Sequence, residues 1–163
     1  MKPPSAEVAF LIRPYRPEDF DGLWQIDQAC FPPGIAYTQM DLTGFLTRRN
    51  AITLVAEFDD GAAASTPGRL AGFAVARPRR AVGRILTLDV VPEARRMGLA
   101  SRLMRECEQR LRAAGCCEVY LETAVNNEAA LQLYHKLGYT IVRTLPEYYS
   151  SHSLDALLLG KLL

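Results

Sequence analysis

The apolar residues of this chain recur with two different periods, and each period predicts one kind of secondary structure. Residues 70–78 and 84–91 are almost continuously apolar and are joined by a basic turn, which is typical of buried strands. Residues 127–138 carry apolar side chains at positions i, i+3, i+4 and i+7, which predicts a helix with one buried face. The apolar positions of that helix are Ala130, Leu133, Tyr134 and Leu137.

Along the whole chain, these two periods predict strands and helices that are separated by turns containing Gly and Pro. Thr38, followed three residues later by Asp41, predicts the start of the second helix. Loops are expected at 59–68 and 146–153. Strands are expected at 8–15, 51–58, 70–78, 84–91, 118–124, 139–145 and 154–162, and helices at 17–31, 38–50, 99–114 and 127–138.

The order of these elements is β-α-α-β-β-β-α-β-α-β-β, with no internal repeat and no linker that would divide the chain. Strands joined by a short turn pair antiparallel, whereas a helical crossover allows parallel pairing. We therefore expect a single α+β domain over residues 1–163, built around a mixed sheet.

Composition narrows the class of protein. The chain has 163 residues, 49% of them apolar, and a net charge of +1, so it can form a core and has no overall basic excess that would indicate a nucleic-acid partner. No run reaches the ~20 apolar residues of a membrane helix, and the N-terminus lacks the apolar stretch of a secretory signal. The four cysteines include no C-x-x-C pair, so we expect free thiols in the cytoplasm and no metal site.

One predicted helix starts without a capping side chain. Residues 95–98, Arg-Arg-Met-Gly, lead from the strand at 84–91 into this helix, whereas most helices begin on Ser, Thr, Asp or Asn. The first N–H groups of a helix have no acceptor within it, and the helix dipole adds partial positive charge. With the small Ala100 and Ser101 in the first turn, this segment is suited to a phosphate or pyrophosphate. The alternative is a solvated basic loop.

The chain contains neither a P-loop nor a G-x-G-x-x-G fingerprint. Residues 95–100 instead resemble the Q/R-x-x-G-x-G/A signature of the GCN5-related N-acetyltransferases (GNAT). This resemblance implies acetyl-CoA as the acetyl donor, and a mostly antiparallel sheet that has helices on both faces and is splayed between its fourth and fifth core strands. It implies that the backbone of Leu88 and Val90 pairs with the pantetheine. The residues that it places near the pyrophosphate are Arg95, Arg96, Gly98, Ala100 and Ser101.

A second block, from Asn127 to Tyr134, resembles the N-x-x-A-x-x-L-Y pattern of many of these enzymes. Glu122 lies five residues before Asn127, on a strand where an unpaired buried carboxylate would be costly. This spacing resembles the ribosomal-protein-alanine N-acetyltransferases, which implies Glu122 as the base, Tyr134 as the acid and Asn127 as a cofactor-binding residue. From the residues alone, Asn127 can instead be a plain helix cap, Tyr134 a core aromatic and Glu122 a solvated residue at a strand end.

Two further stretches resemble the protein N-terminal acetyltransferases. Residues 29–33, which include Phe31, resemble the segment that lines the peptide groove of those enzymes. Tyr148 and Tyr149 resemble a tyrosine pair near their C-terminus, where such a pair can hydrogen-bond a peptide backbone. Residues 123–124 are Thr-Ala, where those enzymes usually carry Val-Arg, and this departure leaves the identity of the peptide open.

The resemblance implies direct attack of a protein or peptide N-terminal amine on the acetyl thioester, with a ribosomal protein among the candidate acceptors. An α-amine, with a pKa near ~8, needs less help from a base than a lysine near ~10.4.

Two alternatives to this function stay open. One is the same chemistry on a small amine or a lysine side chain. The other is a non-catalytic acyl-CoA-binding module, against which the presence of both Glu122 and Tyr134 counts. No membrane partner is expected, and the protein is expected to be a monomer or homodimer. The basic turn at 77–84 either reaches the 3′-phosphate of CoA or is a solvated hairpin.

Overall fold

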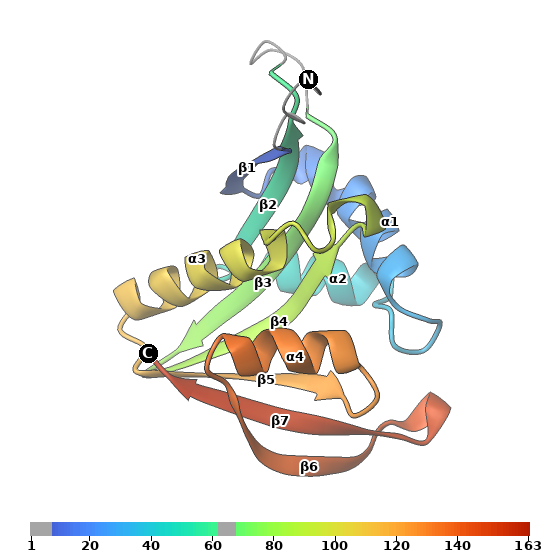
Figure 1. Cartoon of the computed structure of the whole chain (residues 1–163), viewed down its shortest axis with the longest axis vertical. Helices are drawn as coiled ribbons and strands as arrows, with labels where there is room; N and C mark the ends of the chain where they lie inside the picture. Colours follow the sequence, from blue (N-terminus) through green and yellow to red (C-terminus); the bar gives the residue numbers. More distant parts are fainter. Residues whose placement is uncertain (1–7, 62–67) are drawn as a thin grey trace, which may run out of the picture.

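Seven strands form one sheet in the computed structural model, which describes residues 8–61 and 68–163. The strands follow the order β1-β2-β3-β4-β5-β7-β6, and all neighbouring pairs are antiparallel except β4 and β5, which run parallel (Figure 1). The predicted α+β fold with a mixed, mostly antiparallel sheet is therefore confirmed. The strands are β1 (Ala9–Pro14), β2 (Ile52–Asp59), β3 (Leu70–Arg79), β4 (Val82–Val90), β5 (Glu118–Ala124), β6 (Thr140–Tyr149) and β7 (Leu154–Leu162).

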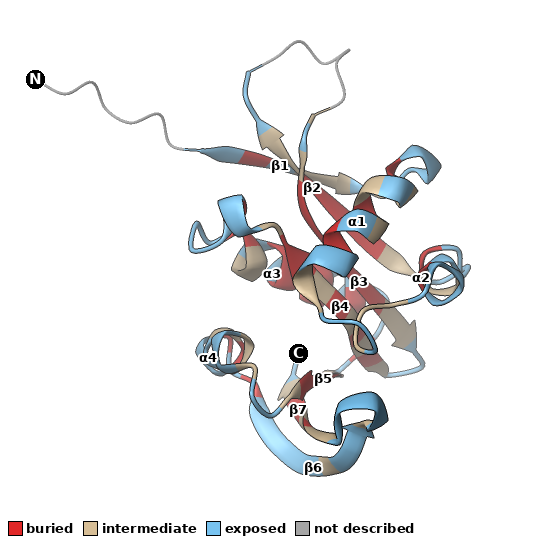
Figure 2. Ribbon diagram, turned by 90° about the vertical axis from the view of Figure 1, so that its right-hand side faces the viewer, coloured by how far each residue is buried: buried red, intermediate tan, exposed pale blue. Residues whose placement is uncertain are grey.

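Helices cover both faces of the sheet, as predicted. Two of them pack on one face and two on the other (Figure 2). Thr38 caps α2 by accepting a hydrogen bond from the backbone N–H of Asp41 at 3.1 Å, which confirms the predicted start of that helix. The helices are α1 (Phe20–Cys30) and α2 (Gln39–Leu46) on one face, and α3 (Leu99–Ala113) and α4 (Glu128–Lys136) on the other.

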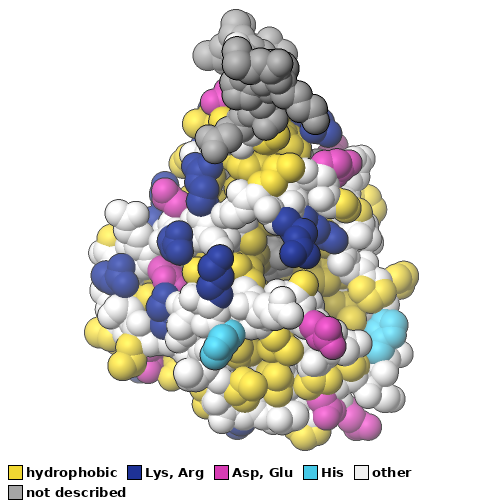
Figure 3. All heavy atoms as spheres, in the orientation of Figure 1, with side chains coloured by type: hydrophobic (Ala, Val, Ile, Leu, Met, Phe, Trp, Pro, Cys, Tyr) yellow, Lys and Arg dark blue, Asp and Glu magenta, His cyan; other side chains and the backbone are white. Residues whose placement is uncertain are grey.

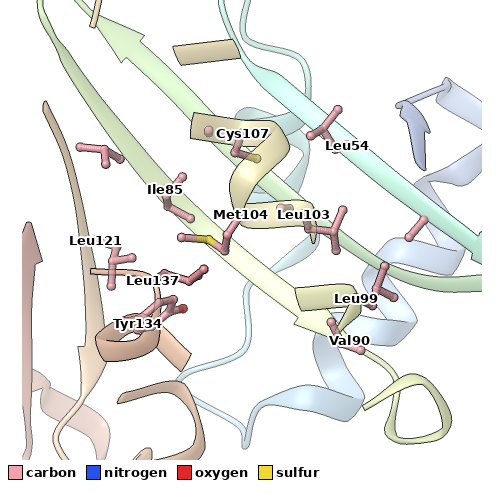
Figure 4. Close-up of a cluster of buried hydrophobic side chains, with 14 of the residues drawn as sticks. Leu54, Ile85, Val90, Leu99, Leu103, Met104, Cys107, Leu121, Tyr134 and Leu137 are labelled. Carbon is pink, nitrogen blue, oxygen red and sulfur yellow. The ribbon is translucent and has the colours of Figure 1, made fainter. Parts of the chain in front are cut away.

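The larger core lies between the sheet and α3. The residues Leu99, Leu103, Cys107 and Leu111 are spaced four apart along this helix, and all four are buried. Figure 4 shows the first three of them in the core. Fully burying one such side chain stabilises the fold by roughly 1.5–3 kcal/mol, so this stripe holds α3 firmly against β2, β3 and β4. The start of α3 is thereby fixed at the C-terminal end of β4.

The strands β4 and β5 pair over only a short length before they diverge. Their register runs from Val82 opposite Glu118 to Arg84 opposite Tyr120, and no further pair follows (Figure 1). Beyond this point Leu86 is an extra residue in β4, because Val75 pairs with Thr87 while Ala76 pairs with Ile85. The bulge increases the local twist of β4, so the predicted splay between the fourth and fifth strands is confirmed.

The prediction of a loop over residues 146–153 is wrong for its first half. Strand β6 continues through Tyr149, which pairs with Leu154, and only Ser150–His152 form a turn. The strand tolerates Pro146 because β6 lies at the edge of the sheet, where one side needs no hydrogen bonds. The backbone N–H of Glu147 is bound instead by Asp155 Oδ1, at 2.8 Å.

Four other expectations concern the end of α2, the cysteines, membrane spans and the loop at 59–68. Helix α2 ends at Leu46 rather than near Asn50. All four cysteines are unpaired, as expected, and none of the described helices is long and apolar enough to cross a membrane. Most of the loop expected at 59–68, and the N-terminal residues 1–7, lie outside the described residues.

Candidate active site

The start of α3 offers backbone N–H groups that no side chain of the helix caps. Gly98 occupies the N-cap position with a left-handed φ of 78°, and no acidic residue lies in the first turn. The first backbone bond of the helix runs from Arg102 N to Gly98 O, so the N–H groups of residues 99–101 have no acceptor inside the helix. Helices α2 and α4, in contrast, each have a side-chain cap. The uncapped helix start is therefore confirmed, and the binding of an anion there stays a prediction.

The two arginines before α3 differ in their surroundings. Arg95 folds back onto β4, where its Nε donates to the backbone oxygen of Val90 at 3.0 Å. Arg96 is exposed and has a left-handed φ of 61°, so the chain turns sharply before Gly98. Lys and Arg side chains are spread over this face of the molecule, around α3 (Figure 3). Arg96 is the better placed of the two to meet an anion at the helix start.

The backbone of Leu88 and Val90 faces the splay. Val91 N donates to Ala71 O on the β3 side, at 2.9 Å. Because successive residues of a strand alternate in direction, the N–H and C=O groups of Val90, and of Leu88 two residues earlier, point away from β3. A chain that enters the splay can therefore pair with them as a further strand would, although the Val90 oxygen already accepts from Arg95.

Tyr134 is the residue of α4 that is buried beside the splay. It packs among core side chains near Leu121 and Leu137 (Figure 4), and its ring contacts the Tyr139 ring edge-on with a centroid distance of 5.8 Å. Burial, reinforced by the charge of Asp89, raises the pKa of Tyr134 above its usual value. The hydroxyl therefore keeps its proton at neutral pH and is suited to donate rather than accept one. Tyr134 is thus a core aromatic residue, and its hydroxyl also lies within the electrostatic influence of Asp89.

Glu122 is neither unpaired nor fully solvated. Its carboxylate forms an ion pair with Arg84 of β4, and its side chain is 16% exposed. Leu121 and Thr123 on either side of it are buried, so Glu122 points toward the opposite face of β5, away from α3 and α4. A group that enters from that face can reach this carboxylate, because part of it stays open to solvent.

A pair of carboxyl groups, Asp27 of α1 and Asp89 of β4, lies buried beside the splay, and neither residue was predicted from the sequence. Their exposed fractions are 0% and 1%. Thr87 donates its hydroxyl proton to Asp89 Oδ1, and the backbone N–H of Tyr37 donates to Asp27 Oδ2 at 2.7 Å. The remaining oxygens, Asp27 Oδ1 and Asp89 Oδ2, have no other partner among the described residues.

Burial raises the pKa of both carboxyl groups, and the charge of Asp27 raises that of Asp89 further. Two adjacent buried carboxyl groups cannot both be ionised without a large cost, so we infer that they share one proton. The other titratable groups facing Asp89 are Cys30 of α1, Tyr37 of the segment after α1, and Tyr134 of α4. The sequence feature that could have indicated Asp89 is the presence of an aspartate inside the apolar run ILTLDVV.

The loop after α1, which follows the first predicted peptide stretch, contacts the turn after Tyr148 and Tyr149. His152 Nε2, in the turn after β6, lies 2.7 Å from the backbone oxygen of Pro33, and Ser151 Oγ donates to the oxygen of Gly34 at 3.5 Å. Tyr148 is half exposed, and its ring contacts that of Tyr149 edge-on at 5.0 Å. Phe31, at the end of α1, is partly buried. The structure therefore places the loop after α1 against the turn after β6, and the role of Phe31, Tyr148 and Tyr149 in peptide binding stays a prediction.

Asn127 acts as a helix cap in this structure. Its side-chain oxygen accepts a hydrogen bond from the backbone N–H of Ala130 at 3.2 Å. This is the plain structural role that the sequence also allowed. Its role in cofactor binding stays a prediction.

The profile of the acetyltransferase (GNAT) family matches residues 20–139. The chain belongs to this family. It is therefore an N-acetyltransferase, and the GNAT fold accounts for both the splayed sheet and the uncapped start of α3.

The similar GNAT proteins include two that span most of this chain. An uncharacterized N-acetyltransferase of Methanocaldococcus jannaschii is 28% identical over 152 residues, which cover 93% of this chain and 90% of that protein. An N-alpha-acetyltransferase of Sulfurisphaera tokodaii is 28% identical over 146 residues, which cover 86% of each. A chain in the crystal structure of the NatC complex bound to Gag peptide and CoA superposes with a TM-score of 0.81 at 26% identity, covering 94% of this chain and 98% of that one.

Proposed function

We propose that this GNAT acetyltransferase transfers the acetyl group of acetyl-CoA to the α-amine of a protein or peptide N-terminus. The observation that carries the proposal is the convergence of three features at the splay: the uncapped start of α3, the backbone of β4 that is directed away from β3, and the contact between the loop after α1 and the turn after β6. The N-alpha-acetyltransferase of S. tokodaii and the peptide-bound NatC complex support an N-terminal acceptor. A ribosomal protein as acceptor stays a prediction.

The donor enters with its pyrophosphate at the N–H groups of residues 99–101, beside Arg96. The space beside Gly98 is open to a ligand, because a Cβ atom at this position would have no neighbour within 4 Å. The left-handed backbone there favours glycine, which leaves this space unfilled. The pantetheine then lies along Leu88 and Val90. This donor set fits a pyrophosphate, which needs several N–H donors and positive charge in one place.

The amine nitrogen attacks the thioester carbonyl carbon, the C–S bond breaks, and the amine loses one proton. In the proposed mechanism Glu122 takes this proton, directly or through a water molecule, because it is the partly exposed carboxylate beside the splay. The backbone N–H of Val90, directed away from β3, donates to the carbonyl oxygen as negative charge develops there. Tyr134 gives its proton to the departing thiolate.

Replacing the proposed base tests both its role and the class of acceptor. Glu122→Gln is expected to lower kcat/KM strongly at neutral pH, and the loss is expected to shrink as the pH rises. An α-amine with a pKa of ~8 becomes neutral by itself within the working range of the enzyme, whereas a lysine at ~10.4 does not. The measurement is kcat/KM between pH 6.5 and 9.5 with a peptide that carries a free N-terminus.

Glu118→Gln is the matched control, because Glu118 lies on the same face of the same strand and its carboxylate accepts only from Tyr120, at 3.0 Å, among the described contacts. This variant is expected to keep the wild-type profile. Wild-type activity of Glu122→Gln at every pH would show that the carboxylate is structural. An equal loss at every pH, with acetyl-CoA still bound, would show that Glu122 positions the peptide instead.

A further inference from the structure

Five arginines from two distant parts of the sequence surround one hollow on the surface. The hollow has a volume of about 570 Å³. One side is formed by the turn between α2 and β2, and the other by the end of β3 and its turn into β4. Asn50 Nδ2 donates to the backbone oxygen of Pro78 at 3.0 Å and ties the two sides together. The arginines are Arg48, Arg49, Arg77, Arg79 and Arg80.

The charge of this hollow is concentrated well beyond the average of the chain. These five are among 19 basic residues, and without them 14 basic residues remain against 18 acidic ones. The protein thus has a net charge of +1 only because a hollow of +5 is balanced by an excess of four negative charges elsewhere. We expected no nucleic-acid partner because the net charge is close to zero. That value does not show that positive charge is concentrated in the hollow and negative charge lies elsewhere.

No carboxylate neutralises the hollow within the described part of the chain. Its lining contains no acidic residue, and none of the five arginines takes part in an ion pair with a described carboxylate. The nearby Glu118 accepts from the Tyr120 hydroxyl and does not line the hollow. Five like charges gathered without counter-ions repel one another, so an anion that binds among them gains favourable interactions with all of them.

The hollow is separate from the acetyl-transfer site. The turn between β3 and β4 lies at one end of β4, and the start of α3 follows the other end (Figure 1). The nine residues of Val82–Val90, at about 3.3 Å each, place these ends roughly 27 Å apart. The basic turn therefore cannot contact an anion bound at residues 96–101.

We propose that this hollow, which we call the arginine hollow, binds a chain of closely spaced phosphate groups. Guanidinium groups recognise phosphate oxygens through paired hydrogen bonds, and several of them in one concavity match several phosphates in sequence. The lining contains no aromatic side chain, so the aromatic platforms on which the bases of single-stranded nucleic acids usually stack are missing from it. Recognition is thus of the phosphates alone, and its sources are inorganic polyphosphate or the backbone of a single-stranded RNA.

The test is equilibrium binding of fluorescent ligands by anisotropy at salt concentrations from 50 to 300 mM. The ligands are inorganic polyphosphate, oligo(U) and oligo(A), matched in number of phosphates. The test variant is Arg48→Gln/Arg49→Gln/Arg79→Gln, since all three side chains are exposed. The control variant, Arg105→Gln/Arg112→Gln/Arg143→Gln, removes the same charge from exposed arginines outside the hollow. Acetyl transfer is measured for both, and is expected to stay at the wild-type level.

Wild-type protein is expected to bind polyphosphate, and to bind oligo(U) and oligo(A) equally. The test variant should weaken binding at least tenfold at low salt and reduce the slope of log Kd against log salt by about 2, since each phosphate contact to a single strand contributes about 0.7. Tighter binding of either RNA than of polyphosphate would identify RNA as the source, and the reverse would identify polyphosphate.

The proposal is overturned if no ligand binds at 50 mM salt, or if the control variant loses as much affinity as the test variant. It is also overturned if the affinities for oligo(A) and oligo(U) differ tenfold. None of these results bears on the acetyl-transfer activity, which is measured separately.

Discussion

Replacing Asp89 by asparagine tests whether the buried carboxyl pair shares a proton. Asparagine has almost the same shape, so its side-chain oxygen can keep the hydrogen bond from Thr87 and its amide can donate to Asp27 Oδ1, which has no other described partner. The substitution therefore removes the titration of Asp89 without opening a cavity. Its effect on stability should come mainly from protonation.

The sign of this effect follows from the raised pKa. Burial and the neighbouring Asp27 hold the pKa of Asp89 well above its ordinary value of 3.8 in the folded protein. The folded state thus keeps a proton that the unfolded chain releases, so wild-type stability falls as the pH rises from about 3.8 toward the folded pKa. One proton of difference gives a slope of at most ~1.4 kcal/mol per pH unit, or about 2.7 kcal/mol over two units.

The assay is urea unfolding at pH 4.5, 5.5 and 6.5 for the wild type, Asp89→Asn and Asp21→Asn. Asp21 is an exposed aspartate of α1, so it serves as the control for losing a carboxylate. Asp89→Asn is expected to gain free energy of unfolding relative to the wild type at each step up in pH, whereas Asp21→Asn is expected to follow the wild type. Parallel pH dependences for the wild type and Asp89→Asn would refute the shared proton.

Two predictions concern the proposed acetyl-transfer site. Saturating acetyl-CoA at ~100 Kd is expected to stabilise the wild type by about 2.7 kcal/mol, and Gly98→Glu should abolish this thermal shift by placing a negative charge at the anion site. Gly98→Ala, which strains only the left-handed backbone, should keep part of the shift, and an unchanged shift in Gly98→Glu would place the donor elsewhere. Tyr134→Phe is expected to lower kcat by ~10²–10⁴ while keeping the affinity for acetyl-CoA, as measured by steady-state kinetics and calorimetry. An unchanged kcat would make Tyr134 a core aromatic only.

The order of the elements could be predicted from the sequence because most segments bury one continuous face. Helix α3 shows this clearly, since Leu99, Leu103, Cys107 and Leu111 recur every four positions and are all buried. The extension of β6 through Tyr149 could not be predicted in this way. It depends on Asp155, which lies eight residues beyond Glu147 and binds its backbone N–H across the turn.

The candidate site was predictable where one short segment carries the chemistry, and unpredictable where distant segments meet. The uncapped helix start at residues 95–101 could be predicted from that segment alone, because a helix start needs no partner to present its N–H groups. Asp89, in contrast, acquires its raised pKa from burial in the folded protein, reinforced by the charge of Asp27, which lies 62 positions earlier in the chain. The ion pair of Glu122 with Arg84 and the arginine hollow likewise depend on contacts that no local pattern reveals.

The position of the transferred acetyl group tests the central claim most directly. Peptides that carry both a free N-terminus and an internal lysine are incubated with the protein and acetyl-CoA, alongside the same peptides with a blocked N-terminus and alongside polyamines. Tandem mass spectrometry then locates the acetyl group. We expect acetylation of the α-amine of the free peptides and none of the blocked ones. Acetylation of the lysine in blocked peptides at an equal rate, or of polyamines alone, would contradict the account.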